Sequence, residues 1–399
     1  MQPRLAIVGG GPAGMMAAIR AAVTLGDGSR VVLFDKNERL GRKIYLTGKG
    51  RCNLTNLRPW EEFAPHIHPN QRFLQQAFRA FSNEDVIRFF EELGVPTVTL
   101  QGQRVYPASL IAGDVARALE RRVQELGIEV RYTTTVGSLA ELDAYAAVII
   151  ATGGKSYPVT GSTGDGYRFA QEAGHTVTAV FPSETALLPR GYDPGLPGLE
   201  MKNVGLQLYI DRALVESEQG DFNFTDDGLE SGIAYHLSRR AVWALCNGQK
   251  VDIILDLKPA LTLEKLEARI ARESASAPRP SRLDPDSLRS FLPKPLVAPF
   301  RRANPDLSLE NLAKRLKSWS FPIVDYKGFE RAVVTAGGVS LKEIVPKTMA
   351  SRLRPGLYFC GEVLDLDGDT GGYNLQIAFS TGALAGANAA AYLLSLQDK

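Results

Sequence analysis

The sequence is poor in the residues that build disulfide frameworks and metal centres. It contains three cysteines and four histidines among 399 residues. Cys52, Cys246 and Cys360 are widely separated and form no CxxC pair, which indicates a reducing compartment and offers no metal site by spacing. We expect Cys52 and Cys360 to pack in the core. His66 and His68 lie two residues apart without an evident third ligand, so we predict no metal.

Long apolar runs and a charge excess of one sign are also missing. No run of about 18 apolar residues occurs, so we expect no membrane-spanning helix. The early run LAIVGGGPAG ends in glycines and does not have the form of an export signal. The net charge of +2 gives no electrostatic reason for binding nucleic acid or a membrane. We therefore expect a cytoplasmic protein that acts on a small molecule, and the oligomeric state stays open.

The hydrophobic pattern predicts an α/β fold. Apolar strands at 4–8 and 31–35 flank an alanine-rich helix at 15–25, which is one βαβ unit. The same analysis predicts further helices at 82–93 and 114–126, with Ser82 as an N-cap, and strands at 128–132 and 146–151.

The middle of the chain has a different pattern. Alternating runs at 204–210 and 251–257 predict antiparallel strands, and the charged segment 262–318 is patterned as helices. After about residue 330 the glycine-rich, apolar style of the N-terminus returns. We predict a first domain that is interrupted and then resumed, with these boundaries: 1–184 and 332–399 for that domain, 185–260 with 319–331 for a β-rich module, and 261–318 for a helical module.

A dinucleotide fingerprint lies between the first strand and the first helix. Gly9–Gly14 has the form G-x-G-x-x-G, in which Gly9 allows a tight turn, Gly11 allows close approach of a pyrophosphate and Gly14 allows close helix packing. Asp35 ends the second strand, where an acid can accept hydrogen bonds from a ribose. The fingerprint predicts a dinucleotide but cannot separate NAD from FAD.

The following loop favours a flavin. GRKIYLTGKGRCNLTN (41–56) has three glycines, four cations and no carboxylate. Such a loop can lie along an extended cofactor, with its N–H groups and cations near the electron-rich edge of a reduced flavin. Near the other end of the chain, 356–390 reads as a strand, a Gly-Glu turn, a glycine-rich loop and a long helix. Residues 370–374 precede that helix, so its N-terminus would stabilise reduced flavin.

These motifs together resemble the BaiN-like flavoproteins, a family that includes the aminoacetone oxidases. The similarity rests on 9–14, 41–56, 151–167, 335–349 and 361–382, in that order. More distantly, the ATGG, TGDG and GLYFCGE elements resemble the fumarate-reductase-type flavoprotein fold. The resemblance implies non-covalent FAD in a Rossmann-like domain that is interrupted by a β-barrel-like module and a small helical module.

The resemblance also implies which residues surround FAD. Val136 is expected on a strand that contacts adenine through its backbone, and Thr152 and Gly153 are expected near the adenosine. The full set of expected cofactor residues is Gly9, Gly11, Pro12, Ala13, Gly14, Asp35, Lys36, Arg42, Lys43, Thr47, Gly48, Gly50, Asn53, Val136, Ala151, Thr152, Gly153, Gly361, Glu362, Asp367, Gly371, Gly372, Tyr373, Asn374, Leu375 and Gln376.

One departure from the family pattern concerns substrate chemistry. The family usually has a histidine after Phe-Thr where this chain has Asp226 in FTDDGLESG. Transfer of a relative's substrate is therefore not implied. No residue is identified as the catalytic acid or base, and Lys49, Arg51 and Tyr373 are candidates only. We expect His236 to be structural.

Three functions are compatible with the sequence. The main prediction is an FAD-dependent oxidoreductase that takes electrons from transiently bound NAD(P)H and reduces an activated double bond of a small organic substrate. One alternative is an amine oxidase of the aminoacetone type that uses oxygen. Another is a non-catalytic flavin-binding redox sensor or interaction protein. A tRNA-modifying flavoenzyme is disfavoured by the near-neutral charge.

Overall fold

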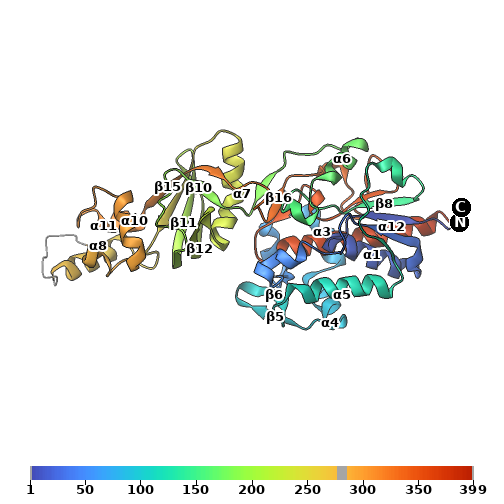
Figure 1. The fold of residues 1–399 in the computed structure, drawn as a ribbon, viewed down its shortest axis with the longest axis horizontal. Coiled ribbons are helices and arrows are strands. Elements are labelled where there is room, and N and C mark those ends of the chain that lie inside the picture. Colours follow the sequence, from blue (N-terminus) through green and yellow to red (C-terminus); the bar gives the residue numbers. More distant parts are fainter. Residues whose placement is uncertain (1, 276–284, 398–399) are drawn as a thin grey trace. The chain divides into compact units, whose positions relative to one another are not determined.

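The chain divides into two compact units in the computed structural model, which describes residues 2–275 and 285–397 (Figure 1). The first unit comprises Met1–Phe181 and Val333–Lys399, and the second comprises Pro182–Ala332. The first unit is therefore built from both ends of the chain.

A five-stranded parallel sheet forms the centre of the first unit. Its strand order is β17-β8-β1-β2-β7, and every neighbouring pair is parallel. The inner strands β1, β2 and β8 are apolar and almost entirely buried, as expected for a sheet that is covered on both faces. The α/β prediction is confirmed by these strands: β1 (Leu5–Val8), β2 (Val31–Phe34), β7 (Glu129–Arg131), β8 (Ala147–Ile150) and β17 (Leu357–Phe359).

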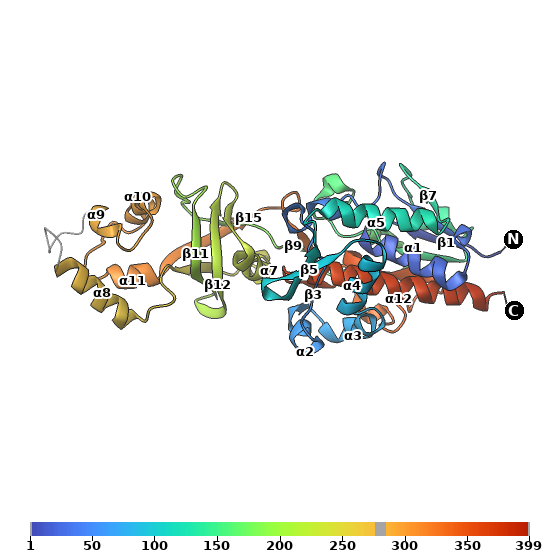
Figure 2. The same cartoon turned by 90° about the horizontal axis from the view of Figure 1, so that it is seen from below.

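Two helices, α1 (Pro12–Leu25) and α12 (Tyr373–Ser395), pack side by side against this sheet (Figures 1 and 2). A Cβ atom at Gly382 would lie 2.4 Å from the Ala13 carbonyl oxygen, and one at Gly386 would lie 2.1 Å from that of Ala17. From the first contact to the second, the residue number rises by four in both helices. The two helices therefore run in the same direction. Because α12 begins nine residues before Gly382, its N-terminus extends about 14 Å beyond this contact.

The length and composition of α12 also satisfy the criteria for a membrane span. Its most apolar window has a mean hydropathy of 1.3, but 72% of that window is buried inside the protein. The alanines and glycines of α12 pack on α1, so α12 is a core helix of the first unit.

Smaller elements complete the first unit. Helix α4 begins with the predicted Ser82 cap, which forms a reciprocal capping box with Asp85. The helices are α2 (Trp60–Phe63), α3 (Gln71–Ala80), α4 (Asn83–Glu92), α5 (Ala112–Glu125) and α6 (Asp165–Glu172). The short strands are β3 (Thr55–Asn56), β4 (Ile67–His68), β5 (Thr97–Leu100), β6 (Arg104–Pro107), β16 (Val334–Ala336) and β18 (Asp367–Gly368), and β9 (Phe181–Ser183) begins at the residue where the first unit gives way to the second.

The second unit is a closed antiparallel barrel with helices. The barrel order is β10-β13-β12-β11-β14-β15, and the predicted strands at 204–210 and 251–257 lie in β11 and β14. Helices α8 to α11 gather on one side of the barrel and α7 lies on another (Figure 2). The elements are β10 (Leu187–Pro189), β11 (Glu200–Ile210), β12 (Ala213–Thr225), β13 (Gly228–Glu230), α7 (Gly232–Cys246), β14 (Val251–Asp256), α8 (Leu263–Ala275), α9 (Pro285–Leu288), α10 (Lys294–Ala303), α11 (Leu312–Lys317) and β15 (Trp319–Tyr326).

The expected placement of Val136 on a strand is wrong. Strand β7 ends at Arg131, and Val136 lies in a coil segment, although it is buried. The chain turns away because Thr133 adopts a positive φ of 47° and Thr134 donates its N–H to the Asp35 carbonyl oxygen.

Candidate functional site

The glycine turn between β1 and α1 has the geometry that the fingerprint predicts. Gly9 has a φ of 106°, and a Cβ on Gly14 would lie 1.8 Å from the Gly9 carbonyl oxygen. By contrast, a Cβ on Gly11 would have no heavy atom within 4 Å. The N-terminus of α1 has neither a side-chain cap nor an acidic residue in its first turn. The N–H groups of its first turn are therefore not capped by a side chain and can bind a phosphate.

Asp35 closes this turn from the second strand. Its Oδ2 accepts a hydrogen bond from the Gly10 N–H at 2.7 Å, and its Oδ1 accepts from the backbone and side chain of Asn37. Each carboxylate oxygen has two lone pairs, so the group can also accept from a ribose hydroxyl. A Cβ on Gly10 would lie 2.8 Å from Oδ2, which explains why glycine occupies this position.

Lys36 and Arg42 hold the loops around Asp35. The Lys36 Nζ donates to Thr163 and pairs with Asp165 at 2.6 Å. Arg42 donates to the Asn37 Oδ1 at 2.7 Å. These cations bring residues 35–42 and 163–165 to the same edge of the sheet.

The basic loop is compact and carries several positive φ angles. Its 3-10 segment Ile44–Gly50 is interrupted at Thr47, and Gly48, Lys49 and Gly50 have φ angles of 56°, 57° and 83°. Thr47 donates its hydroxyl to the Ile44 carbonyl oxygen. The loop thus turns its backbone sharply before Asn53, which fits a segment that wraps a ligand.

Lys43 connects this loop to the C-terminal part of the unit. Its Nζ lies 2.8 Å from Oε2 of Glu362, and the Glu362 Oε1 accepts from the Thr335 N–H at 2.7 Å. Glu362 follows the Gly361 turn at the end of β17, where Gly361 has a φ of 76°. The structure therefore brings together residues from three distant segments of the sequence.

The end of β8 supplies the third side of the site. Ala151, Thr152 and Gly153 follow this strand, and Gly153 has a φ of 72°. The Thr152 hydroxyl is buried and has no hydrogen-bond partner within the described residues. It therefore has an unused donor and acceptor at the carboxyl edge of the sheet.

The N-terminus of α12 carries the remaining predicted residues. Gly371 and Gly372 have φ angles of 132° and 102°, and Asn374 folds back to bond both backbone groups of Gly368. Gln376 uses its side chain internally, since it accepts from Thr55 and donates to Phe81 and Ser380. Its side chain therefore holds the scaffold. Asp367 is fully buried in β18, and Leu375 is buried in the first turn of α12.

The three catalytic candidates have different surroundings. Lys49 and Arg51 are exposed, and the Arg51 guanidinium lies over the Tyr106 ring at 5.4 Å. Tyr373 is 3% exposed, and burial raises its pKa to about 12, so its hydroxyl stays protonated at neutral pH. Its ring stacks on His66 at 4.4 Å. Tyr373 thus packs the base of the loop before α12.

The structure reveals a polar array that the sequence analysis did not identify. Arg58 lies 2.7 Å from His66, and Asp369 accepts from His66 at 2.8 Å and from His68 at 2.9 Å. Asp369 is 303 residues from His66, so local sequence offered no signal beyond the paired histidines. Within the described ranges no group of three ligating side chains is arranged for a metal.

FAD fits the residues at this edge. The Asn53 Oδ1, the Thr152 Oγ1 and the Tyr167 hydroxyl are buried without hydrogen-bond partners among the described residues. A ligand with both donors and acceptors would satisfy them. The two helix N-termini and the open side of Gly11 complement a pyrophosphate and an anionic ring. Tyr167 was not predicted, and burial raises its pKa beyond the normal range for tyrosine.

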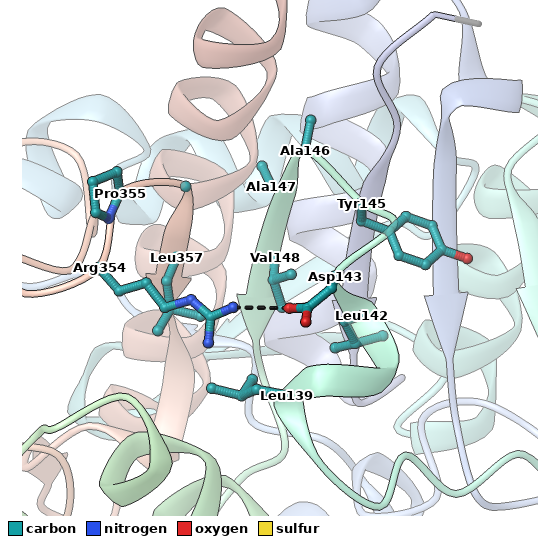
Figure 3. A pocket seen from close by; sticks show the side chains of 11 residues that line it. Leu139, Leu142, Asp143, Tyr145, Ala146, Ala147, Val148, Arg354, Pro355 and Leu357 are labelled. Carbon is teal, nitrogen blue, oxygen red and sulfur yellow. Dashed lines mark hydrogen bonds and ion pairs between the residues drawn. The ribbon is translucent and has the colours of Figure 1, made fainter.

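A depression at the opposite edge of the sheet has a different character. It has a volume of about 90 Å³ and lies at the amino ends of β8 and β17, where Arg354 and Asp143 form an ion pair at 3.1 Å (Figure 3). Ligands of open parallel sheets bind at the carboxyl ends of the strands. This depression is also too small for a dinucleotide, so we do not assign it to the cofactor.

Cys52 and Cys360 lie next to expected cofactor residues in the sequence, whereas Asp226, at the substituted family position, lies in the second unit. Cys52 and Cys360 are fully buried, and burial raises the pKa of Cys52 to about 12, consistent with packing. Asp226 lies in the turn between β12 and β13 of the second unit. The neighbouring Asp227 pairs with Arg331 and Lys327. In the same unit, His236 lies 3.4 Å from Glu218.

Sequence comparison identifies relatives along almost the whole chain. Residues 3–388 match the family described as HI0933-like protein Rossmann domain. The chain is 31% identical over 410 residues to the 3-dehydro-bile acid delta(4,6)-reductase of Clostridium scindens, covering 97% of this chain and 99% of the relative. It is also 31% identical over 404 residues to the ribosomal RNA dihydrouridine synthase of Escherichia coli K12, covering 94% and 95%.

Structural comparison supports the fold. The crystal structure of 3-ketosteroid-delta4-(5alpha)-dehydrogenase from Rhodococcus jostii RHA1 matches with a TM-score of 0.52 at 14% identity. The match covers 98% of this chain and 100% of that chain. At this identity the similarity establishes the architecture alone.

Proposed function

This chain belongs to the HI0933-like Rossmann-domain family and is an FAD-dependent oxidoreductase, and we propose that it reduces a carbon–carbon double bond conjugated with a carbonyl group, using electrons from NAD(P)H. The proposal includes a small organic substrate and transient binding of the nicotinamide, because the described chain carries one glycine fingerprint at Gly9–Gly14.

The observation that supports this proposal is the chemistry shared by two relatives of equal identity. A 3-dehydro bile acid with a Δ4 double bond is an enone. The C5–C6 double bond of uracil is likewise conjugated with a carbonyl, and dihydrouridine has gained two hydrogens there. Both names therefore describe the same bond change on very different molecules. A hydride adds to the carbon distant from the carbonyl, and a proton adds to the adjacent carbon.

The residues of this chain would bind and orient the cofactor for that reaction. FAD, when bound, supplies the hydride chemistry. The α1 N-terminus would hold the pyrophosphate and Asp35 the ribose. Lys43 and Glu362 would face the middle of the cofactor, and the α12 N-terminus at Tyr373 would place positive potential at the ring edge.

Anaerobic mixing of the holoprotein with NADH and with NADPH tests the electron donor. We expect the flavin absorbance to bleach with at least one nicotinamide and to recover on addition of an enone. A flavin that dithionite reduces but neither nicotinamide bleaches would contradict the reductase. Oxygen uptake with amines would then be measured to test the oxidase alternative. A flavin that dithionite and every substrate tried fail to reduce would support the sensor alternative.

A second candidate substrate is uridine in RNA. The relative from E. coli is named for ribosomal RNA. The helical segment 261–318 contains twelve Lys and Arg residues against seven Asp and Glu, a net charge of +5, whereas the whole chain is only +2. A concentrated positive charge of this kind suits a phosphate backbone.

The two substrate classes are separable in one experiment. NAD(P)H oxidation would be followed with steroid and non-steroid enones, and dihydrouridine would be measured by mass spectrometry after incubation with unmodified ribosomal RNA. Turnover of enones without dihydrouridine formation would select the small-molecule reading. The reverse result would select RNA and contradict our expectation that the partner is a small molecule.

A further inference from the structure

The array of Arg58, His66, Asp369 and His68 lies directly before the N-terminus of α12. Strand β4 pairs with β18, which places His68 opposite Asp367 and Ile67 opposite Gly368. The Asp369 N–H donates to the His66 carbonyl oxygen at 3.0 Å. Backbone and side chains thus join two segments that are 300 residues apart.

The hydrogen bonds assign the protons of His66. Arginine can only donate, so the His66 Nε2 accepts from Arg58, and the proton on Nδ1 is donated to Asp369 Oδ2. The ring thus connects the Arg58 cation to the Asp369 carboxylate. His68 donates a second hydrogen bond to Asp369 Oδ1.

The array is held rigidly on every side. The Arg58 N–H donates to the Asn56 Oδ1, and Asn83 donates to the Arg58 carbonyl oxygen at 2.9 Å. Asn56 also donates to the Gly371 carbonyl oxygen at 3.1 Å, inside the loop before α12. The side chains of His66, His68 and Asp369 are 24%, 22% and 18% exposed, so their charges are only partly screened.

The position of Asp369 has an electrostatic consequence. A carboxylate a few residues before a helix N-terminus opposes the positive potential of that terminus. The loop 371–376 is where we expect the edge of the flavin that becomes anionic on reduction. An unpaired Asp369 would disfavour the reduced form, whereas Arg58 opposes this effect through His66. Arg104 is the other charge that acts on Tyr373 beside the array.

We propose that Arg58, His66, Asp369 and His68 are positioning residues that set the reduction potential of the bound flavin by fixing and compensating the Asp369 charge beside the α12 N-terminus. This inference rests on the proposed function in so far as FAD binds along this edge. It requires neither NAD(P)H nor an enone.

The test is the flavin midpoint potential of the holoprotein, measured anaerobically with dithionite and a mediator dye. Asp369→Asn removes the negative charge and is expected to raise the potential. Arg58→Gln removes the positive charge and is expected to lower it. The double variant should lie close to the unsubstituted protein. Asp143→Asn and Arg354→Gln remove the charges of an ion pair at the opposite edge of the sheet and are expected to leave the potential unchanged.

A purely structural role would move both single variants in the same direction or would change only the amount of FAD retained. Shifts of the same sign, or shifts no larger than those of the controls, would overturn the proposal. If Asp369→Asn or Arg58→Gln is isolated without FAD, the midpoint potential of His68→Leu tests the proposal instead. Loss of the hydrogen bond from His68 to Asp369 should lower this potential. An unchanged potential there would also overturn the proposal. Failure of the enzymatic function would appear separately, as a flavin that dithionite reduces and NAD(P)H does not.

Discussion

The Nζ of Lys43 lies 2.8 Å from Oε2 of Glu362, although 319 residues separate the two in the sequence. Their side chains are 20% and 22% exposed. This pair joins the basic loop of the N-terminal segment to the Gly-Glu turn of the C-terminal segment. The cofactor edge therefore exists only after both ends of the chain have assembled.

Lys43→Met is expected to weaken FAD binding about tenfold, which corresponds to about 1.4 kcal/mol, because a cation beside the phosphates or ring is lost. A flavin fluorescence titration of the apoprotein measures this. Lys317→Met is a matched control, since Lys317 pairs with Asp256 at 2.7 Å with 21% and 19% exposure. Equal FAD affinity losses in both variants would show that the effect is only destabilisation.

Gly11→Ala is expected to weaken FAD binding, whereas Gly14→Ala is expected to destabilise the fold. A Cβ at Gly11 meets no atom of the protein, so the apoprotein should keep its stability and lose FAD affinity. A Cβ at Gly14 would overlap the Gly9 carbonyl, so the apoprotein itself should lose about 1–3 kcal/mol. Urea denaturation of both apoproteins checks this. A destabilised Gly11→Ala apoprotein would contradict the free space found beside Gly11.

Thr152→Val should separate stability from binding. The Thr152 hydroxyl is buried without a partner in the described chain, so replacing it with a methyl group should stabilise the apoprotein by up to about 1 kcal/mol. The same change should weaken FAD binding, because the hydroxyl is expected to contact the cofactor. Thermal unfolding with and without FAD measures both effects. Stronger FAD binding by the valine variant would show that the hydroxyl faces no ligand.

His175 is expected to make the first unit less stable in mild acid. Burial lowers the pKa of His175, although the nearby Glu343 opposes this. The unfolded chain then binds more protons than the folded chain between the folded pKa and about pH 6.5, so stability falls as the pH drops through this window. His175→Gln should remove this dependence of the unfolding free energy on pH, measured by urea unfolding between about pH 5 and 7. If the pH dependence persists in this variant, other titrating groups cause it.

Cys246 should be the single fast-reacting thiol. It is exposed and lies 3.3 Å from the Tyr326 hydroxyl, whereas Cys52 and Cys360 are buried. A thiol reagent should label one cysteine in the native protein and three after denaturation. Cys246→Ser should abolish the native labelling. Rapid labelling of a second site would contradict the burial of Cys52 and Cys360.

Local features were predictable because their causes lie within a few residues. The strand, glycine turn and helix at 5–25 follow from apolar runs and from the backbone freedom of Gly9. The Ser82 capping box depends on a residue only three positions away. The alternation in β11 likewise predicts a half-buried strand directly.

Features that depend on distant contacts were predicted poorly. Val136 was expected on a strand, but a turn at Thr133 that is tied to residues 35 and 37 ends β7 earlier. The hydrogen bonds of the Gln376 side chain to Thr55 and Phe81 were likewise not predicted. No local pattern encodes such contacts.

The sequence by itself determined the parallel α/β sheet, the antiparallel strands in the middle of the chain and the glycine turn at which we expect a dinucleotide to bind, because hydrophobic period, glycine spacing and helix caps are local properties. Only the tertiary structure decided that Lys43 meets Glu362 and that Asp369 is held between His66 and His68. These partners are about 300 residues apart, and their contact depends on the packing of α12 along α1, which fixes the C-terminal loop against the N-terminal segment.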